Sequence, residues 1–355
     1  ALGNMGEKAA TNEVIEKLLS LLEDEHYSVR YSVCEALGDM GEKAATNEVI
    51  EKLVSLLGDD DYNVRNSACE ALGNMGVKAA TNEAIEKLAS AVGDDNYKVR
   101  YSACEALGNM GEKAATNEVI EKLVSAVGDD YYSVRWSACR ALGKMGEKAA
   151  TNEVINKLVS LLGDQDAWVR MSACAALGNM GEKAATNEVI EKLVSALGDQ
   201  DGWVSESACK ALAYMGEKAA TNEVIDKLVS LLGDQDDSVR ESACEALGNM
   251  GEKAATNEVI DKLVSALGDQ DDSVRYSACE ALGKMGEKAT TNYVIETLLK
   301  MMKNGKHVHA ELQNLVVYLL KLTSVLERLD SRLILDCYEL ETNFDILEGI
   351  SLEKL

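Results

Sequence analysis

A period of 35 residues runs through most of this 355-residue chain and restricts its possible folds more than any other feature. A threonine followed by asparagine recurs without insertion or deletion, at Thr11, Thr46, Thr81, Thr116, Thr151, Thr186, Thr221, Thr256 and Thr291. Tandem units of this length pack on their neighbours and form extended arrays instead of one closed core. The period therefore predicts eight full repeats over residues 11–290, which we number 1 (11–45) to 8 (256–290).

Each repeat contains two segments with helical periodicity. The first, as in "NEVIEKLLSLL", places apolar residues on one face and follows a threonine suited to cap a helix. In the second, "SVRESACEALGNMG", Ser238 and Glu241 have capping-box spacing, and Gly251 is suited to end the helix in a left-handed conformation. The segment "GEKAA" then leads to the next threonine. Two antiparallel helices per repeat predict an all-α solenoid, and the absence of proline agrees with this.

The run "DDDYNVRNSACEALGNMG", residues 59–76, resembles the second-helix signature of short HEAT repeats. In that signature a turn aspartate precedes Val-Arg, and Ala, Ala-Leu-Gly and a final Gly follow. The resemblance covers about four fifths of the chain, whereas the tryptophan, leucine-glycine and proline pattern of tetratricopeptide repeats is missing. It implies a right-handed superhelix whose second helices line the concave face, used mostly as a binding or scaffolding surface.

The repeat sets the expected domain organisation. Residues 1–10 are expected to be the tail of a truncated preceding repeat, which suggests an excised fragment. Residues 11–300 form the array, with a degenerate ninth first helix after the eight full repeats. Residues 301–355 diverge and are expected to form helices that cap the open end of the array. Their leucines leave dimerisation as an alternative, although a monomer is favoured.

Charge and cysteine usage limit the partners and the compartment. The formal net charge of −25 opposes binding to nucleic acid and to anionic membrane surfaces, and no segment is long and apolar enough to span a membrane. Eight of the nine cysteines occupy one column of the repeat, Cys34 to Cys279. Neighbouring helices about 8 to 10 Å apart are too distant for disulfides, so free thiols are expected. Free thiols in this number predict that the protein resides in a reducing compartment, the cytosol.

Several columns change from copy to copy while the rest of the repeat is almost constant. They lie in the turn before the second helix and on the outward face of that helix, and they hold all three tryptophans. Exposed aromatic residues dominate interaction hot spots, so we expect a protein partner to bind there. The predicted binding residues are Tyr31, Tyr97, Tyr101, Tyr131, Tyr132, Trp136, Arg140, Lys144, Trp168, Met171, Trp203, Glu206, Lys210, Tyr214 and Tyr276.

Repeats 4 to 6 concentrate the most distinctive of these residues. Trp136, Trp168 and Trp203 occur there with the cations Arg140, Lys144 and Lys210, in an otherwise acidic protein. We expect this patch to be the centre of the interface, for a partner that presents apolar and acidic groups.

Nothing in the sequence predicts catalysis, a cofactor or a metal site. There is no His-Glu pair within a helix, as di-iron enzymes of this architecture require, and the turn aspartates lack the ligand spacing of a calcium loop. We therefore expect a non-enzymatic scaffold. One alternative is a sensing or autoinhibitory region of a larger signalling NTPase. Another, less favoured, is a metal-dependent enzyme.

An arginine column borders the predicted core and is expected to pair with turn aspartates of its own or an adjacent repeat. Ser205 replaces this arginine in repeat 6, and Ala213 replaces a glycine that we place on the rim of the exposed face. These two changes predict a local deviation in curvature over residues 186–255.

Overall fold

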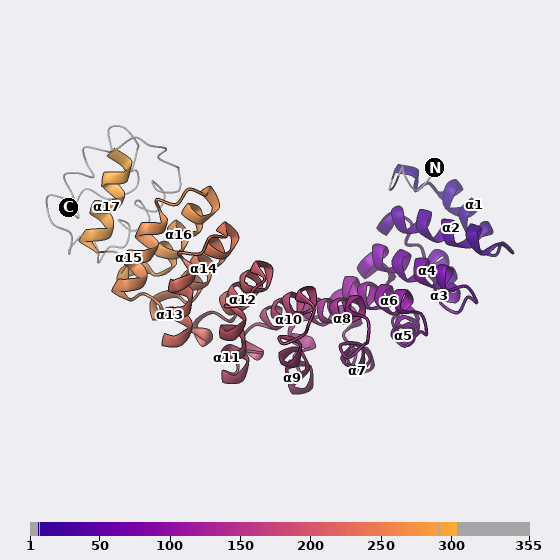
Figure 1. The fold of residues 1–355 in the computed structure, drawn as a ribbon. Coiled ribbons are helices and arrows are strands. Elements are labelled where there is room, and N and C mark those ends of the chain that lie inside the picture. Colours follow the sequence, from indigo (N-terminus) through magenta and orange to yellow (C-terminus); the bar gives the residue numbers. More distant parts are fainter. Residues whose placement is uncertain (1–5, 7, 290, 304–355) are drawn as a thin grey trace. The chain divides into compact units, whose positions relative to one another are not determined.

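The computed structural model describes residues 6, 8–289 and 291–303, and within them the chain is helical throughout, without β-strands (Figure 1). The predicted all-α solenoid of stacked helix pairs is confirmed. The chain divides into two compact units, Ala1–Ala184 (unit 1) and Ala185–Leu355 (unit 2). The helices expected within 311–349 lie outside the described residues, and the domain boundaries remain predictions.

Each repeat contributes a first helix, a second helix and a short 3-10 helix, which we call the A helix, the B helix and the connector. In unit 1 the A helices are α1 (Asn12–Leu21), α3 (Asn47–Leu56), α5 (Asn82–Ala91), α7 (Asn117–Ala126) and α9 (Asn152–Leu161). The B helices are α2 (Tyr27–Asp39), α4 (Tyr62–Met75), α6 (Tyr97–Met110), α8 (Tyr132–Lys144) and α10 (Ala167–Asn179). The connectors are η2 (Gly41–Lys43), η3 (Gly76–Ala79), η4 (Gly111–Ala114), η5 (Gly146–Lys148) and η6 (Gly181–Lys183).

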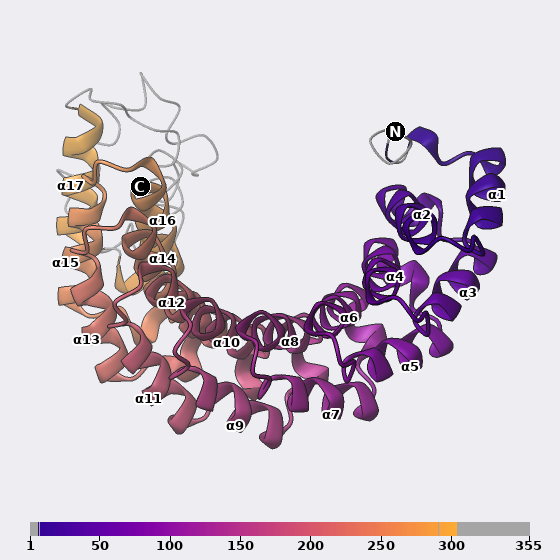
Figure 2. The same cartoon turned by 45° about the vertical axis from the view of Figure 1, so that its right-hand side comes forward.

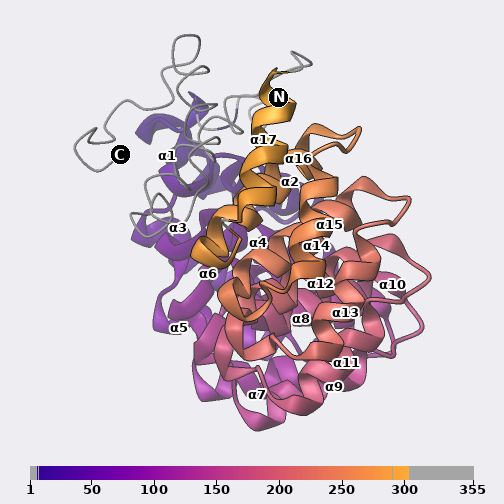
Figure 3. The same cartoon turned by 90° about the vertical axis from the view of Figure 1, so that its left-hand side faces the viewer.

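Unit 2 continues the same order (Figure 3). Its A helices are α11 (Asn187–Ala196), α13 (Asn222–Leu231) and α15 (Asn257–Ala266), and α17 (Asn292–Lys303) is the first helix of the degenerate ninth repeat. The B helices are α12 (Gly202–Met215), α14 (Asp237–Asn249) and α16 (Asp272–Lys284). The connectors are η7 (Gly216–Ala219), η8 (Gly251–Lys253) and η9 (Gly286–Lys288).

The helix ends follow the sequence signals with one correction. Threonine caps the A helices as predicted, and in α3 the Thr46 hydroxyl accepts the backbone N–H of Val49 at 3.3 Å. The predicted capping box at Ser238 is wrong, because Asp236 is the cap of α14 and its carboxylate accepts the N–H of Ser238 at 2.9 Å. Aspartate also adds a negative charge at the positive end of the helix dipole. Gly251 has the expected positive φ, 59°, but it opens the connector η8.

Small side chains allow consecutive B helices to approach closely. A Cβ atom added at Gly108 would lie 2.9 Å from the Cα of Ala141 in the next B helix, so only glycine fits there. Consecutive B helices consequently touch along their lengths, whereas consecutive A helices make few contacts. Within each unit the B helices therefore lie on the inner side of the curve and the A helices on the outer side (Figure 2).

An arginine of each B helix in repeats 1 to 4 connects its repeat to the next one. Arg100 donates from Nε and Nη2 to both carboxylate oxygens of Asp129, at 2.7 and 2.9 Å, and from Nη1 to the carbonyl of Asp94. The same bidentate pairing joins Arg30 to Asp59, Arg65 to Asp94 and Arg135 to Asp164 in unit 1, and Arg240 to Asp269 in unit 2. The predicted arginine ladder is confirmed in these repeats, and its carboxylates come from the following repeat.

The joint between α12 and α14 departs from this pattern twice. Ser205 donates its hydroxyl to the carbonyl of Leu197 in its own repeat, so Asp234, the corresponding ladder aspartate, receives no arginine from repeat 6. Ala213 is 3% exposed, which corrects its placement on an exposed rim. Its counterpart Gly248 faces Ala281 so closely that an added Cβ would lie 2.7 Å from the Cα of that residue. The local deviation in curvature remains a prediction, now with two physical causes.

Candidate binding surface

The variable columns lie on the surface of both units. Trp168 is 57% exposed in unit 1, and Trp203 and Tyr214 are 64% and 58% exposed in unit 2. Tyr276 is exposed as well, whereas Tyr31, Met171 and Glu206 are half-buried. By contrast, the core columns are closed to solvent, with Leu and Met side chains fully buried in every described repeat. Tyr97, Tyr101, Trp136 and Arg140 are half-buried too, so the variable columns are confined to exposed and half-buried positions and are absent from the buried core.

Rings of neighbouring repeats stack on each other in unit 1. Tyr97 and Tyr131 lie with their ring centroids 4.3 Å apart and their planes 4° from parallel. Tyr101 and Trp136 form a second stack, with centroids 6.0 Å apart. Stacking of this kind orients the rings and lowers the entropy lost when they bind another surface. The sequence placed these residues in variable columns but could not show that they touch.

The cations expected to make repeat 4 basic have acceptors in repeat 3. Arg140 donates to Glu105 at 3.0 Å, and its guanidinium lies 4.6 Å from the centroid of the Trp136 ring. Lys144 donates to Oδ1 of Asn109 at 2.6 Å. Partial burial and the nearby Arg140 charge lower the pKa of Lys144. Arg140 therefore contributes a neutralised pair, and this part of the predicted patch is less basic than its composition suggests.

The corresponding surface of unit 2 is acidic around one lysine. Lys210 forms an ion pair with Glu206 one turn earlier in α12. Burial acts against its charged form, but the bond to Glu206 and the charges of Glu241 and Glu245 raise the pKa of Lys210. Burial also raises the pKa of Glu241. Three carboxylates thus surround one ammonium group, and the exposed ring of Tyr214 lies one turn further along the helix.

At the turns between A and B helices, sequence reasoning predicted Tyr97 and Tyr132 but missed the acidic residues that accompany the turn tyrosines. In repeats 1 to 4 an acidic residue stands two positions before a tyrosine that begins the B helix, while repeats 5 to 8 have glutamine and a non-aromatic residue at these positions. The pairs are Glu25 with Tyr27, Asp60 with Tyr62, Asp95 with Tyr97, and Asp130 with Tyr132. Comparing the two columns together, instead of one at a time, would have found them.

A second ladder, also missed, runs along the connectors. The Lys148 ammonium lies 3.2 Å from the Glu112 carboxylate of the preceding repeat, and Lys183 lies 3.3 Å from Glu147. All four side chains are more than half exposed, so each pair contributes little to stability. The signal was present in the recurring "GEKAA", and Val77 interrupts it in repeat 2.

The cysteine column is buried and free of disulfides in all eight described repeats, Cys34 to Cys279. Burial raises the pKa of Cys104 to about 12, which leaves its thiol protonated and unreactive at neutral pH. These thiols act as small core residues between B helices.

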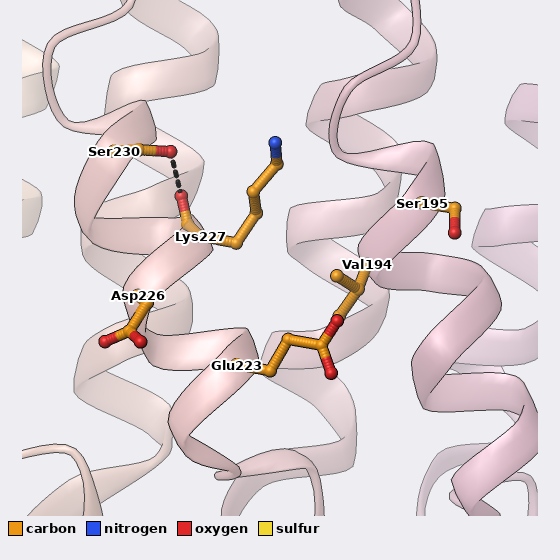
Figure 4. Close-up of a pocket in the computed structure, with 6 residues that line it drawn as sticks. All are labelled: Val194, Ser195, Glu223, Asp226, Lys227 and Ser230. Carbon is orange, nitrogen blue, oxygen red and sulfur yellow. Dashed lines mark hydrogen bonds between the residues drawn. The ribbon is translucent and has the colours of Figure 1, made fainter.

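The outer side of each unit has shallow depressions between A helices. The one in unit 2, about 690 Å³, lies between α11 and α13, with Glu223 of α13 extending toward Val194 of α11 (Figure 4). A similar depression of about 490 Å³ separates α3 from α5 in unit 1. Both are lined mainly by nearly constant A-helix residues, so they follow from the separation of A helices on the outer side.

The described residues contain no cluster of three or more histidine, cysteine, aspartate or glutamate side chains that could hold a metal ion. None of their helices is both long enough and apolar enough to cross a membrane. The histidines His307 and His309 lie outside the described part of the chain.

Comparisons with known proteins agree with the architecture. A family model for HEAT repeats matches six overlapping segments, residues 15–97, 50–130, 85–155, 120–213, 190–258 and 225–308. A crystal structure of an engineered protein is similar, with a TM-score of 0.61 over 89% of this chain and 94% of that chain. Its sequence identity of 23% limits the likeness to the fold. No curated protein sequence matches significantly.

Proposed function

Because the chain belongs to the HEAT-repeat family, we propose that it is a non-enzymatic scaffold that binds a protein partner through the variable face of its B helices. The observation that carries this proposal is that variation avoids the buried framework: large aromatic side chains such as Trp168 and Trp203 are exposed on a nearly constant, buried core. Exposed aromatic anchors with few rotatable bonds supply contact area at low entropic cost.

The properties of the partner follow from the same surface. With a net charge of −25 the chain repels phosphate backbones and anionic lipid, which supports a protein partner over nucleic acid or membrane. The eight free, buried thiols support a reducing compartment, the cytosol. We propose a monomeric array, with residues 301–355 as its cap.

The test is capture of protein partners by the full chain and by the triple variant W136A/W168A/W203A. We expect the variant to lose its specifically captured partner, because three central anchors are removed and each such truncation commonly costs about 2 kcal/mol or more. Circular dichroism should show unchanged helical content, since Trp168 and Trp203 are mostly exposed. A small decrease in the melting temperature is expected from W136A, because Trp136 is half-buried and stacked on Tyr101.

The matched control changes the outer face of the same three repeats. Ser125, Ser160 and Ser195 are exposed at equivalent positions of α7, α9 and α11, so S125A/S160A/S195A should capture the partner as the unmodified chain does. Equal capture by the tryptophan variant, or equal loss in the serine control, would contradict binding through the variable face.

A further inference from the structure

The turns of repeats 1 to 4 present a surface that the tryptophan patch does not include. We call it the acid–tyrosine edge, and it consists of Glu25, Tyr27, Asp60, Tyr62, Asp95, Tyr97, Asp130 and Tyr132. All eight residues belong to unit 1. The two columns change together after repeat 4, to Gln165, Gln200, Gln235 and Gln270 in one and to Ala167, Gly202, Asp237 and Asp272 in the other. Such joint replacement indicates that the acid and the tyrosine serve one purpose.

The carboxylates of this edge are exposed, and only the backbone carbonyls of these acidic residues accept hydrogen bonds from the described part of the chain. Arg65 donates to the carbonyl of Asp60 at 3.2 Å, and Arg100 donates to the carbonyl of Asp95 at 3.1 Å. Within the described residues, none of the four carboxylates accepts a hydrogen bond or forms an ion pair. The arginine ladder thus fixes the main chain while four negative charges stay available to a ligand.

Three of the four tyrosines of this edge are exposed, and the fourth, Tyr97, is half-buried. Tyr27, Tyr62 and Tyr132 are 52%, 38% and 54% exposed, although each occupies the first position of a B helix. Tyr97 is fixed by its stack with Tyr131. Next to the edge, the guanidinium of Arg100 lies 5.8 Å from the centroid of the Tyr131 ring, which precedes Tyr132 in the chain, so a cation already lies near an aromatic ring in these turns.

We propose that the acid–tyrosine edge docks an extended, lysine- and arginine-rich segment of the protein partner. A carboxylate next to an aromatic face suits a cationic side chain, which gains an ion pair and a cation–π contact together. The inference rests on the proposed function, since it specifies the charge of the protein partner and the surface, the acid–tyrosine edge, that binds it. The tryptophan patch predicts a partner with acidic groups, whereas this edge predicts a partner with basic groups. Arg140 of the patch is already paired with Glu105.

The spacing of the edge predicts the spacing of the cations. Packed helices lie about 8 to 10 Å apart, and consecutive B helices here are in close contact. An extended chain advances about 3.3 Å per residue. One basic side chain at about every third residue would therefore meet successive acid–tyrosine pairs, and about ten residues would span all four repeats.

The experiment measures binding of labelled synthetic peptides to the full chain by fluorescence anisotropy. The probe is a twelve-residue peptide of serine and glycine with lysine at every third position. We expect it to bind and to be displaced by salt, and we expect D60N/D95N/D130N to weaken its affinity about tenfold or more. The variant Y27L/Y62L/Y132L, which keeps the charge, should weaken binding as well.

Three comparisons are able to overturn the inference. The control D226N/D237N/D261N removes three exposed carboxylates from unit 2, so an equal loss of affinity there would reduce the effect to net charge. A peptide with glutamate in place of lysine must not bind equally well. A peptide with the same lysines in one cluster should bind more weakly. Equal binding would contradict docking of an extended segment along the four repeats.

The same peptides separate this inference from the proposed function. W136A/W168A/W203A leaves the edge intact, so its affinity for the lysine peptide should equal that of the unmodified chain. Peptide binding that persists in this variant together with undiminished partner capture would contradict only the role of the tryptophans. Absence of peptide binding to the unmodified chain, with partner capture retained, would overturn only the acid–tyrosine edge.

Discussion

At the scale of single residues, neighbouring aspartates of one turn have different roles. Asp129 lies at the joint between repeats 3 and 4 and accepts two bonds from Arg100, whereas the carboxylate of Asp130 is exposed. Burial acts to raise the pKa of Asp129, but the bonds from Arg100 and from the N–H of Tyr131 outweigh it and lower that pKa below its usual range. The same direction holds for Asp59, Asp94, Asp164 and Asp269.

The ladder should therefore make stability depend on pH in the acid range. Because the folded-state pKa of Asp129 is lowered, its contribution is fully present above the unfolded pKa of about 3.9 and is lost as the pH falls through the folded value. We expect D129N to lower the free energy of unfolding by about 2 kcal/mol at pH 7, the usual contribution of hydrogen bonds to a charged group. Urea denaturation from pH 7 to pH 2 measures this.

The neighbouring residue supplies the control for that measurement. D130N removes the same charge from an exposed side chain, so we expect a change within about 0.5 kcal/mol at every pH. The gap between the unmodified chain and D129N should close as the pH falls. A gap that is constant down to pH 2 would show that the Arg100 to Asp129 pair does not stabilise the fold through its charge.

At the scale of elements, the contact between α12 and α14 lacks both the glycine and the arginine that join other consecutive B helices. In repeats 1 to 4 and 7 a glycine allows close approach of the next B helix and an arginine bonds an aspartate of the next turn. At this joint Ala213 adds a methyl group to the contact and Ser205 leaves Asp234 without its arginine. Since two independent contacts change at one place, this joint should be the weaker one in unit 2.

Restoring the arginine should strengthen this joint. We expect S205R to raise the free energy of unfolding by about 1 to 2 kcal/mol, because a bidentate bond to the Asp234 carboxylate would form as it does between Arg240 and Asp269. The double-mutant cycle with D234N, followed by urea denaturation, isolates that bond. An equal gain with and without D234N would assign the effect to something other than the ladder.

At the scale of the whole molecule, the chain is a series of similar repeats in which contacts join mainly neighbours. Stability in such arrays is approximately a sum of repeat and joint contributions, and ends open more readily than interior repeats. Among the described repeats, repeat 1 packs on one complete repeat, whereas repeat 3 lies between two. The buried cysteine in every repeat provides a local reporter of this opening.

Thiol labelling should reveal an order of opening within unit 1. Burial raises the pKa values of Cys34 and Cys104 to about 12, so neither thiol reacts while its repeat is folded. In urea below the unfolding midpoint, we expect iodoacetamide to modify Cys34 at least several-fold faster than Cys104, as measured by mass spectrometry. Labelling in full denaturant corrects for intrinsic reactivity. Equal rates below the midpoint would instead show that unit 1 opens as one block.

The sequence alone was sufficient for most of what repeats locally. The 35-residue period, the threonine caps, the core and cysteine columns, and the position of the variable face all depend on residues within one or two helical turns, where spacing dictates which side chains share a face. The start of the B helices was misassigned, because serine and aspartate both cap helices and their competition depends on the turn.

The contacts between repeats needed the tertiary structure. The arginine column was visible in the sequence, but its partner 29 residues later depends on how one helix pair stacks on the next. The pairing of Arg140 with Glu105 and the place of Ala213 between α12 and α14 depend on the same stacking. Periodicity specifies the direction of each side chain within its helix, whereas the distance and offset between helices decide which side chains meet and which charges stay available to a partner.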